Sequence, residues 1–295
     1  MERVSTGERT AADQLMVSDC SPDRALTERI LEVADEAGYR AALIDATDGS
    51  VTAWPWFART VRAAAAGLAR RGLAEGDTVG VFVQDAASAA IAVNAIRAAG
   101  GRACLIRSDA GPADIADQLN ACAARVLITS APLAGLAAEG ADRSRVRQVI
   151  AFGDADGTTP FSSLLGSGRH SAPGWQPDGP AAAEPSFADR SGPAHESGRP
   201  EGNGQTHERD LTDSGEPGSA GDLTHRDVVV AGPPCGDGPA YTSLLDLTLL
   251  AGATLVAAPV PLVAPALRVY KGTAAIVPPG TRVPGLEPAR IFAAG

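Results

Sequence analysis

Short runs of apolar residues alternate with helical patterns along most of this chain, and this alternation limits its fold more than any other feature. Strands are predicted at 78–83, 103–106, 125–129 and 147–152, separated by predicted helices at 88–99, 112–123 and 132–138. Strands that are apolar throughout are typical of parallel sheets covered by helices on both faces. The sequence therefore predicts the α/β class, with parallel-sheet layers covered by helices.

The alternation begins before residue 78 and resumes after residue 222. The first elements are a helix at 25–37, a hairpin from 39–46 and 50–53, and a helix at 54–71; the last are helices at 241–250 and 264–270 and strands at 254–257, 274–277 and 290–293. No helix follows the last strand, so we expect a second sheet that is incomplete at its C-terminal end. Its apolar residues then need a cover, which is either the first sheet or a second chain. These residues are Leu255, Val256, Ile276, Val277, Ile291 and Phe292.

A segment of different composition separates the two sets of elements. Residues 171–222 contain ten carboxylates against three arginines, with nine glycines and seven prolines, and Leu211 is their only aliphatic residue larger than alanine. Such a stretch buries too little apolar surface to offset its chain entropy, which predicts a mostly disordered linker or a very large loop. The predicted organisation is a disordered N-terminus at 1–24, an α/β subdomain at 25–170, this acidic linker, and a partial second α/β subdomain at 223–295.

Charge and cysteine content exclude several classes of protein. The formal charge is −10 with a single lysine, Lys271, and the arginines are scattered, so nucleic-acid binding is disfavoured. No apolar run is long enough to span a membrane and the N-terminus lacks the features of a signal peptide, so we expect a cytoplasmic protein with no membrane partner. Cys20, Cys104, Cys122 and Cys235 form no CxxC pair, which predicts reduced thiols and no metal site.

Two glycine-rich stretches in the acidic segment are candidates for holding a phosphate: SGRPEG at 197–202 and SGEPG at 214–218. Glycine suits this task because backbone N–H groups approach a phosphate closely where no side chain intervenes. Neither stretch contains a lysine, and each contains a glutamate. A carboxylate about 4 Å from a phosphate costs up to about 4 kcal/mol at an effective dielectric constant near 20. A plain Gly/Pro linker is the competing interpretation of both stretches.

Six stretches, taken together, resemble the motifs of one enzyme superfamily. They are GLARRGLAEGDTVGV (67–81), AIRAAGG (95–101), RVLIT (125–129), LLAGATLV (249–256), YKGTAAIVPP (270–279) and ARIFAAG (289–295). Their order and spacing resemble the N-terminal domain of the acyl-adenylate-forming superfamily, the AMP-dependent synthetases and ligases that include acyl-CoA ligases, luciferases and peptide-synthetase adenylation domains. For an active member, this resemblance implies formation of an acyl-AMP from a carboxylic acid with ATP and Mg²⁺.

The resemblance also implies two registers for the phosphate loop, which in the family has the form SGTTGxPKG followed by LTHxN. The first register consists of Ser197, Gly198, Glu201, Gly202 and His207. The second consists of Ser214, Gly215, Gly218 and His225. In the first register Glu201 stands where the family has lysine, and the second register also lacks one. The later family motif P.FH..G reads PPCGDG at 233–238, without its aromatic residue and its histidine.

These departures from the family pattern determine the predicted function. We expect a truncated, acyl-CoA ligase-like protein that has no catalytic residue, needs no cofactor and acts as a noncatalytic binding or assembly partner. Its partner would be another copy of itself or a second adenylate-forming chain. The alternative is an acyl-CoA ligase or adenylation protein that activates a carboxylate with ATP and Mg²⁺ and is completed by another chain.

Overall fold

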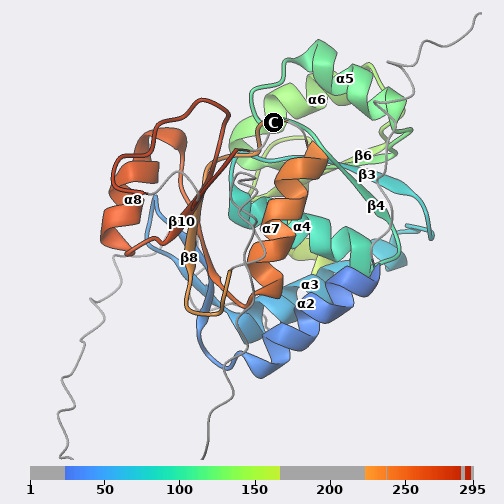
Figure 1. Ribbon diagram of the computed structural model, residues 1–295. Coiled ribbons are helices and arrows are strands. Elements are labelled where there is room, and N and C mark those ends of the chain that lie inside the picture. The colour runs from blue at the N-terminus through green and yellow to red at the C-terminus, as the bar shows by residue number, and fades with distance from the viewer. Residues whose placement is uncertain (1–23, 167–222, 237, 287–289, 294–295) are drawn as a thin grey trace, which may run out of the picture.

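Two β-sheets with helices between and outside them form the frame of the protein (Figure 1). The computed structural model describes residues 24–166, 223–236, 238–286 and 290–293, so the predicted linker at 171–222 lies outside the described residues. The helices are α2 (Arg24–Glu36), α3 (Trp54–Arg70), α4 (Ala86–Ala98), α5 (Pro112–Ala121), α6 (Ala134–Asp142), α7 (Gly238–Leu250) and α8 (Val263–Val269), with short 3-10 helices η1 (Ala131–Leu133), η2 (Phe161–Leu164) and η4 (Val260–Leu262).

The strands are β1 (Ala41–Asp45), β2 (Val51–Ala53), β3 (Thr78–Phe82), β4 (Arg102–Leu105), β5 (Val126–Ser130), β6 (Gln148–Phe152), β7 (Thr159–Pro160), β8 (Val228–Ala231), β9 (Thr254–Ala257), β10 (Ala274–Val277) and β11 (Ile291–Ala293). The five-stranded sheet has the order β4-β3-β5-β6-β7 and is parallel throughout. The six-stranded sheet has the order β11-β10-β8-β9-β1-β2, and within it β1 and β2 form an antiparallel pair. This arrangement confirms the predicted α/β class with parallel-sheet layers.

One hydrophobic core joins the two sheets. Helices α4 and α7 lie between the sheets and contact strands of both (Figure 1). Helix α3 contacts β1, β2 and η2, and α2 packs on α3, α4 and α7. Because side chains alternate along a strand, Val229 of β8 points into this core while Val230 points outward to the side covered by α8. On the outer face of the five-stranded sheet, Phe82 and Leu127 pack with residues of α5 and α6. The layers therefore run helix, sheet, helix, sheet, helix.

Helix α3 shows how the local sequence determines an element. Pro55 lies in its first turn, where a missing N–H leaves no hydrogen bond unmade. Trp54, Phe57 and Val61 recur at three- and four-residue spacing and are fully buried. Gly67 allows a close approach, because a Cβ at this position would collide with the backbone of Leu164 in η2. The sequence thus specifies both the buried face of α3 and the place where η2 crosses it.

The positions of most predicted elements are confirmed to within a few residues, although α6 ends at Asp142 rather than at residue 138, and the main differences concern β8, β7, η2 and α7. Strand β8 was not predicted as a strand, because periodicity alone does not distinguish an apolar run of four residues from a buried helix or loop. Strand β7 and helix η2 were not predicted either, since elements of two and four residues are too short to show a periodic pattern. Helix α7 begins at Gly238 rather than at residue 241, because Pro239 fits the first turn of a helix.

The hairpin of β1 and β2 crosses the predicted division into subdomains at 25–170 and 223–295. Although it precedes the five-stranded sheet in the chain, its strand β1 pairs in parallel with β9, with Leu43 opposite Leu255. Thr254 Oγ1 also donates a hydrogen bond of 2.9 Å to the Ala41 carbonyl oxygen. The six-stranded sheet is therefore assembled from segments on both sides of the acidic segment.

Most of the six apolar residues expected to need a cover are buried within the chain, and Ile291 is only partly buried. Leu255, Val256 and Ile276 are fully buried, and Val277 is 1% exposed. Their inner-facing members contact the central helices, and the outer-facing ones contact α8. The structure therefore shows that these residues are covered mainly by other parts of the same chain. Association with a second copy stays a prediction that this burial does not support. In the described part of the chain, none of the helices has the length and apolar character that crossing a bilayer requires.

Candidate functional site

The predicted phosphate-loop residues fall almost entirely outside the described part of the chain. Ser197, Gly198, Glu201, Gly202 and His207 of the first register, and Ser214, Gly215 and Gly218 of the second, all lie outside it. His225 is described: it is exposed, and its backbone oxygen accepts a hydrogen bond of 2.8 Å from Arg40 Nη1. It precedes β8 and so lies at the amino end of that strand, whereas parallel α/β sheets bind ligands at the carboxyl ends. Both registers stay predictions.

The turn that carries His225 is organised by the carboxylate of Asp227. Thr224 donates two hydrogen bonds to Asp227 Oδ2, from its backbone N at 2.7 Å and its Oγ1 at 2.9 Å. Thr273 Oγ1 donates to Asp227 Oδ1 at 2.7 Å, and Arg290 Nη1 lies 3.4 Å from the same oxygen. Burial raises the pKa of Asp227, but the hydrogen bonds from Thr273 and Thr224 and the charge of Arg290 together bring it below its ordinary value. This group connects the amino ends of β8, β10 and β11 and has a structural role.

The carboxyl ends of β3, β4 and β8 meet in one region of the structure. Open parallel sheets bind ligands at the carboxyl ends of their strands, so this region is the candidate site. We call the segments at 83–88, 106–110, 232–236 and 238–242, which include the first turns of α4 and α7, the sheet junction. Ser108 connects two of them, since its backbone N and its Oγ each donate a hydrogen bond of 3.0 Å to the Pro234 oxygen. The backbone also approaches closely here, because a Cβ on Gly238 would lie 2.8 Å from the Leu105 oxygen.

Three titratable side chains of the sheet junction have shifted pKa values. Burial raises the pKa of Asp85, and the hydrogen bond that its carboxylate accepts from Ser88 N at 2.6 Å only partly opposes this. Burial, with the nearby Asp109, raises the pKa of the Cys235 thiol. Burial also raises the pKa of Tyr241, assisted by the charges of Cys235 and Asp85. Tyr241 and Cys235 are therefore held neutral at pH 7, and neither is activated as a nucleophile or base.

The charge of the sheet junction does not fit a triphosphate. Among its described residues the formal charges are those of Asp85, Asp109 and Arg107. Arg107 Nε is paired with Asp109 Oδ1 at 3.1 Å, and the carboxylate of Asp85, whose charged form burial disfavours, caps the first turn of α4. The described residues of the junction therefore offer a phosphate no unpaired cation. For Mg²⁺, the described residues contain no group of three or more His, Cys, Asp or Glu side chains arranged to hold a metal ion.

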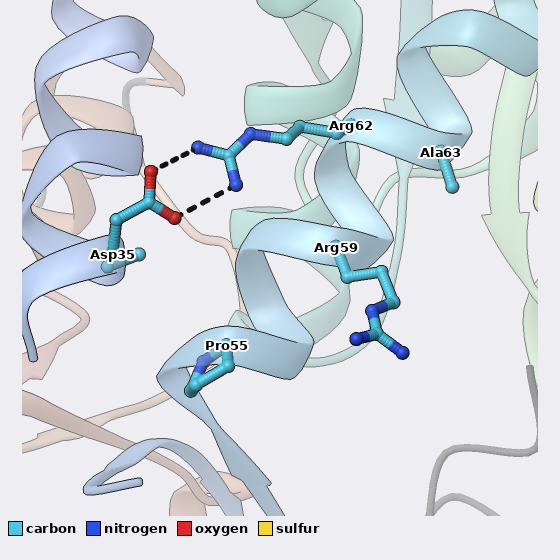
Figure 2. A pocket seen from close by; sticks show the side chains of 6 residues that line it. Asp35, Pro55, Arg59, Arg62 and Ala63 are labelled. Carbon is cyan, nitrogen blue, oxygen red and sulfur yellow. Dashed lines mark hydrogen bonds and ion pairs between the residues drawn. The ribbon is translucent and has the colours of Figure 1, made fainter. Parts of the chain in front are cut away.

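An open pocket of about 550 Å³ lies elsewhere, between α2 and α3, and is shown in Figure 2. Arg62 and Asp35 cross it with two hydrogen bonds of 3.0 and 2.7 Å, so the charge of this guanidinium is already neutralised. Arg59 also lines the pocket, and its guanidinium carbon lies 4.5 Å from the centre of the Trp56 ring. The Arg62 hydrogen bond outweighs a small effect of burial and lowers the pKa of Asp35. The pocket is an open surface groove crossed by an ion pair, and it lies between helices rather than at a sheet edge.

Tyr241 anchors the loop that follows β8, which gives a first testable prediction. Its hydroxyl donates a hydrogen bond of 2.6 Å to the Gly232 oxygen, and its side chain is fully buried. We expect Tyr241→Phe to lower the free energy of unfolding by about 1 kcal/mol, because the buried carbonyl loses its partner. Urea unfolding measures this change, and Tyr39→Phe, at a residue that is 86% exposed, is the matched control. Equal stabilities of the two variants would contradict the anchoring role.

The family resemblance pointed to one segment of the sheet junction, 233–238, but sequence reasoning did not predict that this segment meets Asp85 and Tyr241. Asp85 had a signal, because an aspartate between a predicted strand and a predicted helix is a common N-cap and marks the carboxyl end of the strand. Cys235 lies in the stretch at 233–238 that the family motif marked, whereas Tyr241 had no signal, since the strand β8 that places it was not predicted. Their proximity to Asp85 depends on pairing between helices and strands more than 140 residues apart in the chain.

Comparison with known proteins defines the class. A family model described as AMP-binding enzyme matches residues 31–188, which is more than half of the chain. The chain therefore belongs to the AMP-binding enzyme family, within the adenylate-forming superfamily. No curated protein sequence is similar enough to be counted as a relative.

Solved structures show the same fold. The long-chain-fatty-acid-CoA ligase of Archaeoglobus fulgidus superposes with a TM-score of 0.61 at 16% identity, over 86% of this chain and 51% of that one. The benzoate CoA ligase of Burkholderia xenovorans gives 0.60 at 17% identity, over 86% and 50%. The N-terminal domain of FACL13 from Mycobacterium tuberculosis gives 0.59 at 14% identity, over 86% and 62%. The fold matches the N-terminal domain of adenylate-forming enzymes, and the chain spans about half the length of the two ligases.

Proposed function

We propose that this chain is an acyl-CoA ligase-like protein that does not activate a carboxylate by itself and acts as a noncatalytic binding or assembly partner. The observation that most supports this proposal is the charge of the sheet junction. Acyl-AMP formation develops negative charge at the α-phosphate of ATP, and enzymes stabilise such charge with cations that are already in place. The described residues of the junction instead offer no unpaired cation, because Arg107 is paired with Asp109 and the charged form of Asp85 is disfavoured by burial.

The sequence supports the same proposal at two further positions. Glu201 occupies the lysine position of the family's phosphate loop in one register, and the segment at 233–238 lacks the aromatic residue and the histidine of the corresponding motif. In the structure, the Pro234 oxygen of this segment accepts hydrogen bonds from the backbone N and the Oγ of Ser108. The contact that holds the segment at the sheet junction is therefore made by its backbone. We propose a cytoplasmic location and, as partner, a second copy of the chain or another adenylate-forming chain.

We expect the purified chain to catalyse no carboxylate-dependent exchange of pyrophosphate into ATP. The physical reason is that the described residues of the sheet junction place no unpaired cation where it could offset the phosphate charge. The assay uses labelled pyrophosphate, ATP with Mg²⁺ and a broad panel of carboxylic acids, with a no-enzyme blank. We also expect Glu201→Lys to leave the exchange at the blank level. The restored positive charge attracts a phosphate by up to about 4 kcal/mol, but it does not supply the other contacts that position ATP and the carboxylic acid.

Calorimetric titration with ATP separates binding from catalysis. Heat of binding without exchange is the result expected of a protein that retains a nucleotide site and has lost its chemistry. Exchange above the blank with any acid of the panel would overturn the proposal and favour carboxylate activation instead. If exchange arises only when a second adenylate-forming chain is added, the alternative of an enzyme completed by another chain is supported.

A further inference from the structure

Two cysteines of different elements face each other on the outer side of the five-stranded sheet. Cys104 lies on β4, and its register partner on β3 is Gly80. A Cβ on Gly80 would lie 2.5 Å from Leu119 Cδ2, so this face of the sheet is the one on which α5 packs. Paired residues of neighbouring parallel strands point to the same face, which directs the Cys104 side chain toward α5.

Cys122 lies at the end of that helix. It is the C-cap residue of α5, and its Sγ donates a hydrogen bond of 3.6 Å to the Leu119 oxygen. Its side chain packs with the outer core that includes Leu119 and Ile106. Cys104 and Cys122 are both half-buried. The fold thus brings together two thiols that are 18 positions apart in the sequence.

The two thiols interact directly. The Cys104 thiol hydrogen-bonds to the sulfur of Cys122, and this contact is the largest cause of a lowered pKa at Cys122. Burial opposes the shift, while the backbone N–H groups of Ala124 and Cys122 favour it. Cys122 therefore has more thiolate character than an ordinary cysteine, and the thiolate is the reactive form. Cys235 differs, because burial and Asp109 raise its pKa.

We propose that Cys104 and Cys122 are a redox couple that forms a reversible disulfide between β4 and the end of α5, with a peroxide as the oxidant. The Cys122 thiolate attacks one oxygen of hydrogen peroxide, which breaks the O–O bond, forms a sulfenic acid and releases hydroxide. The sulfur of Cys104 then attacks the sulfenic sulfur, the S–O bond breaks and a second hydroxide leaves. The hydroxides take up the two thiol protons, so two thiols and one peroxide yield one disulfide and two waters.

Tryptic mapping of the full chain tests this couple directly. Cleavage after the arginines at 102, 107 and 125 places Cys104 in the peptide 103–107 and Cys122 in the peptide 108–125. After treatment of the reduced protein with hydrogen peroxide, we expect these two peptides to be joined, with a mass two hydrogens below their sum, and to separate again with dithiothreitol. The number of free thiols in the unfolded protein should fall from four to two.

Variants identify the residues without depending on activity. Cys104→Ser and Cys122→Ser should each abolish the joined peptide, whereas Cys235→Ser is the matched control and should retain it. The wild-type map alone decides the question if a variant fails to fold. Separate peptides with Cys122 oxidised to sulfinic acid, or a disulfide that joins Cys122 to Cys20 or Cys235, would overturn the proposal.

Discussion

Replacing Asp246 by alanine is expected to lower the free energy of unfolding by about 3 to 5 kcal/mol, the range for breaking a buried ion pair from one side. Asp246 Oδ2 lies 2.7 Å from Arg97 Nη1, and the two side chains are only 6% and 14% exposed. The pair joins α7 to α4 inside the central helix layer. Without Asp246 the guanidinium of Arg97 stays out of water with its charge unpaired, which is the source of the large effect. Urea unfolding followed by circular dichroism measures it.

Two comparisons make this prediction specific. Asp117→Ala removes an exposed helical carboxylate and is the matched control, which we expect to change stability by less than about 0.5 kcal/mol. The double variant Arg97→Met with Asp246→Ala should be more stable than Asp246→Ala alone, because it no longer buries an unpaired charge. A single variant as stable as the Asp117 control would show that the pair does not join the two helices.

Replacing Asp227 by alanine is expected to lower the free energy of unfolding by about 2 kcal/mol, because hydrogen bonds to a buried charged group are lost together. The carboxylate accepts hydrogen bonds from Thr224 and Thr273 and lies beside Arg290, and its side chain is 11% exposed. The variant removes the common acceptor at the amino ends of three strands. Asp156→Ala, which removes an exposed carboxylate from a turn, is the control.

The same variant has an expected pH dependence. The pKa of Asp227 in the folded protein lies below its ordinary value, so its contribution to stability is complete above the unfolded pKa of about 3.9 and is lost as the pH falls through the folded value. The stability difference between wild type and Asp227→Ala should therefore be constant from pH 7 to about pH 5 and shrink below about pH 4. A difference that grew on acidification would contradict the lowered pKa.

Most helices and strands were predictable because their signals are local. The three- and four-residue spacing of Trp54, Phe57 and Val61 predicted α3 and its buried face, and the structure confirms both. The apolar run that became β3 likewise predicted a parallel strand covered on both faces. The family resemblance rested on short motifs at fixed spacing, and the family match confirms it.

The candidate site was much less predictable. Eight of the nine predicted phosphate-loop residues lie outside the described part of the chain, and His225 lies at the amino end of β8. The sheet junction, by contrast, brings Asp85 near Tyr241 and Cys235. A sequence pattern shows which residues need burial, but the pKa of a buried group depends on neighbours from distant segments.

The sequence by itself determined the α/β class, the order of the central elements and the face that α3 buries, because these depend on side chains a few positions apart. Only the tertiary structure decided that the β1 and β2 hairpin joins the six-stranded sheet beside β9 and that α7 packs between both sheets. It also placed Cys104 against Cys122. The physical reason is that the hydrophobic effect is non-directional. An apolar pattern shows that a face must be buried, but which element covers that face depends on how the whole chain packs.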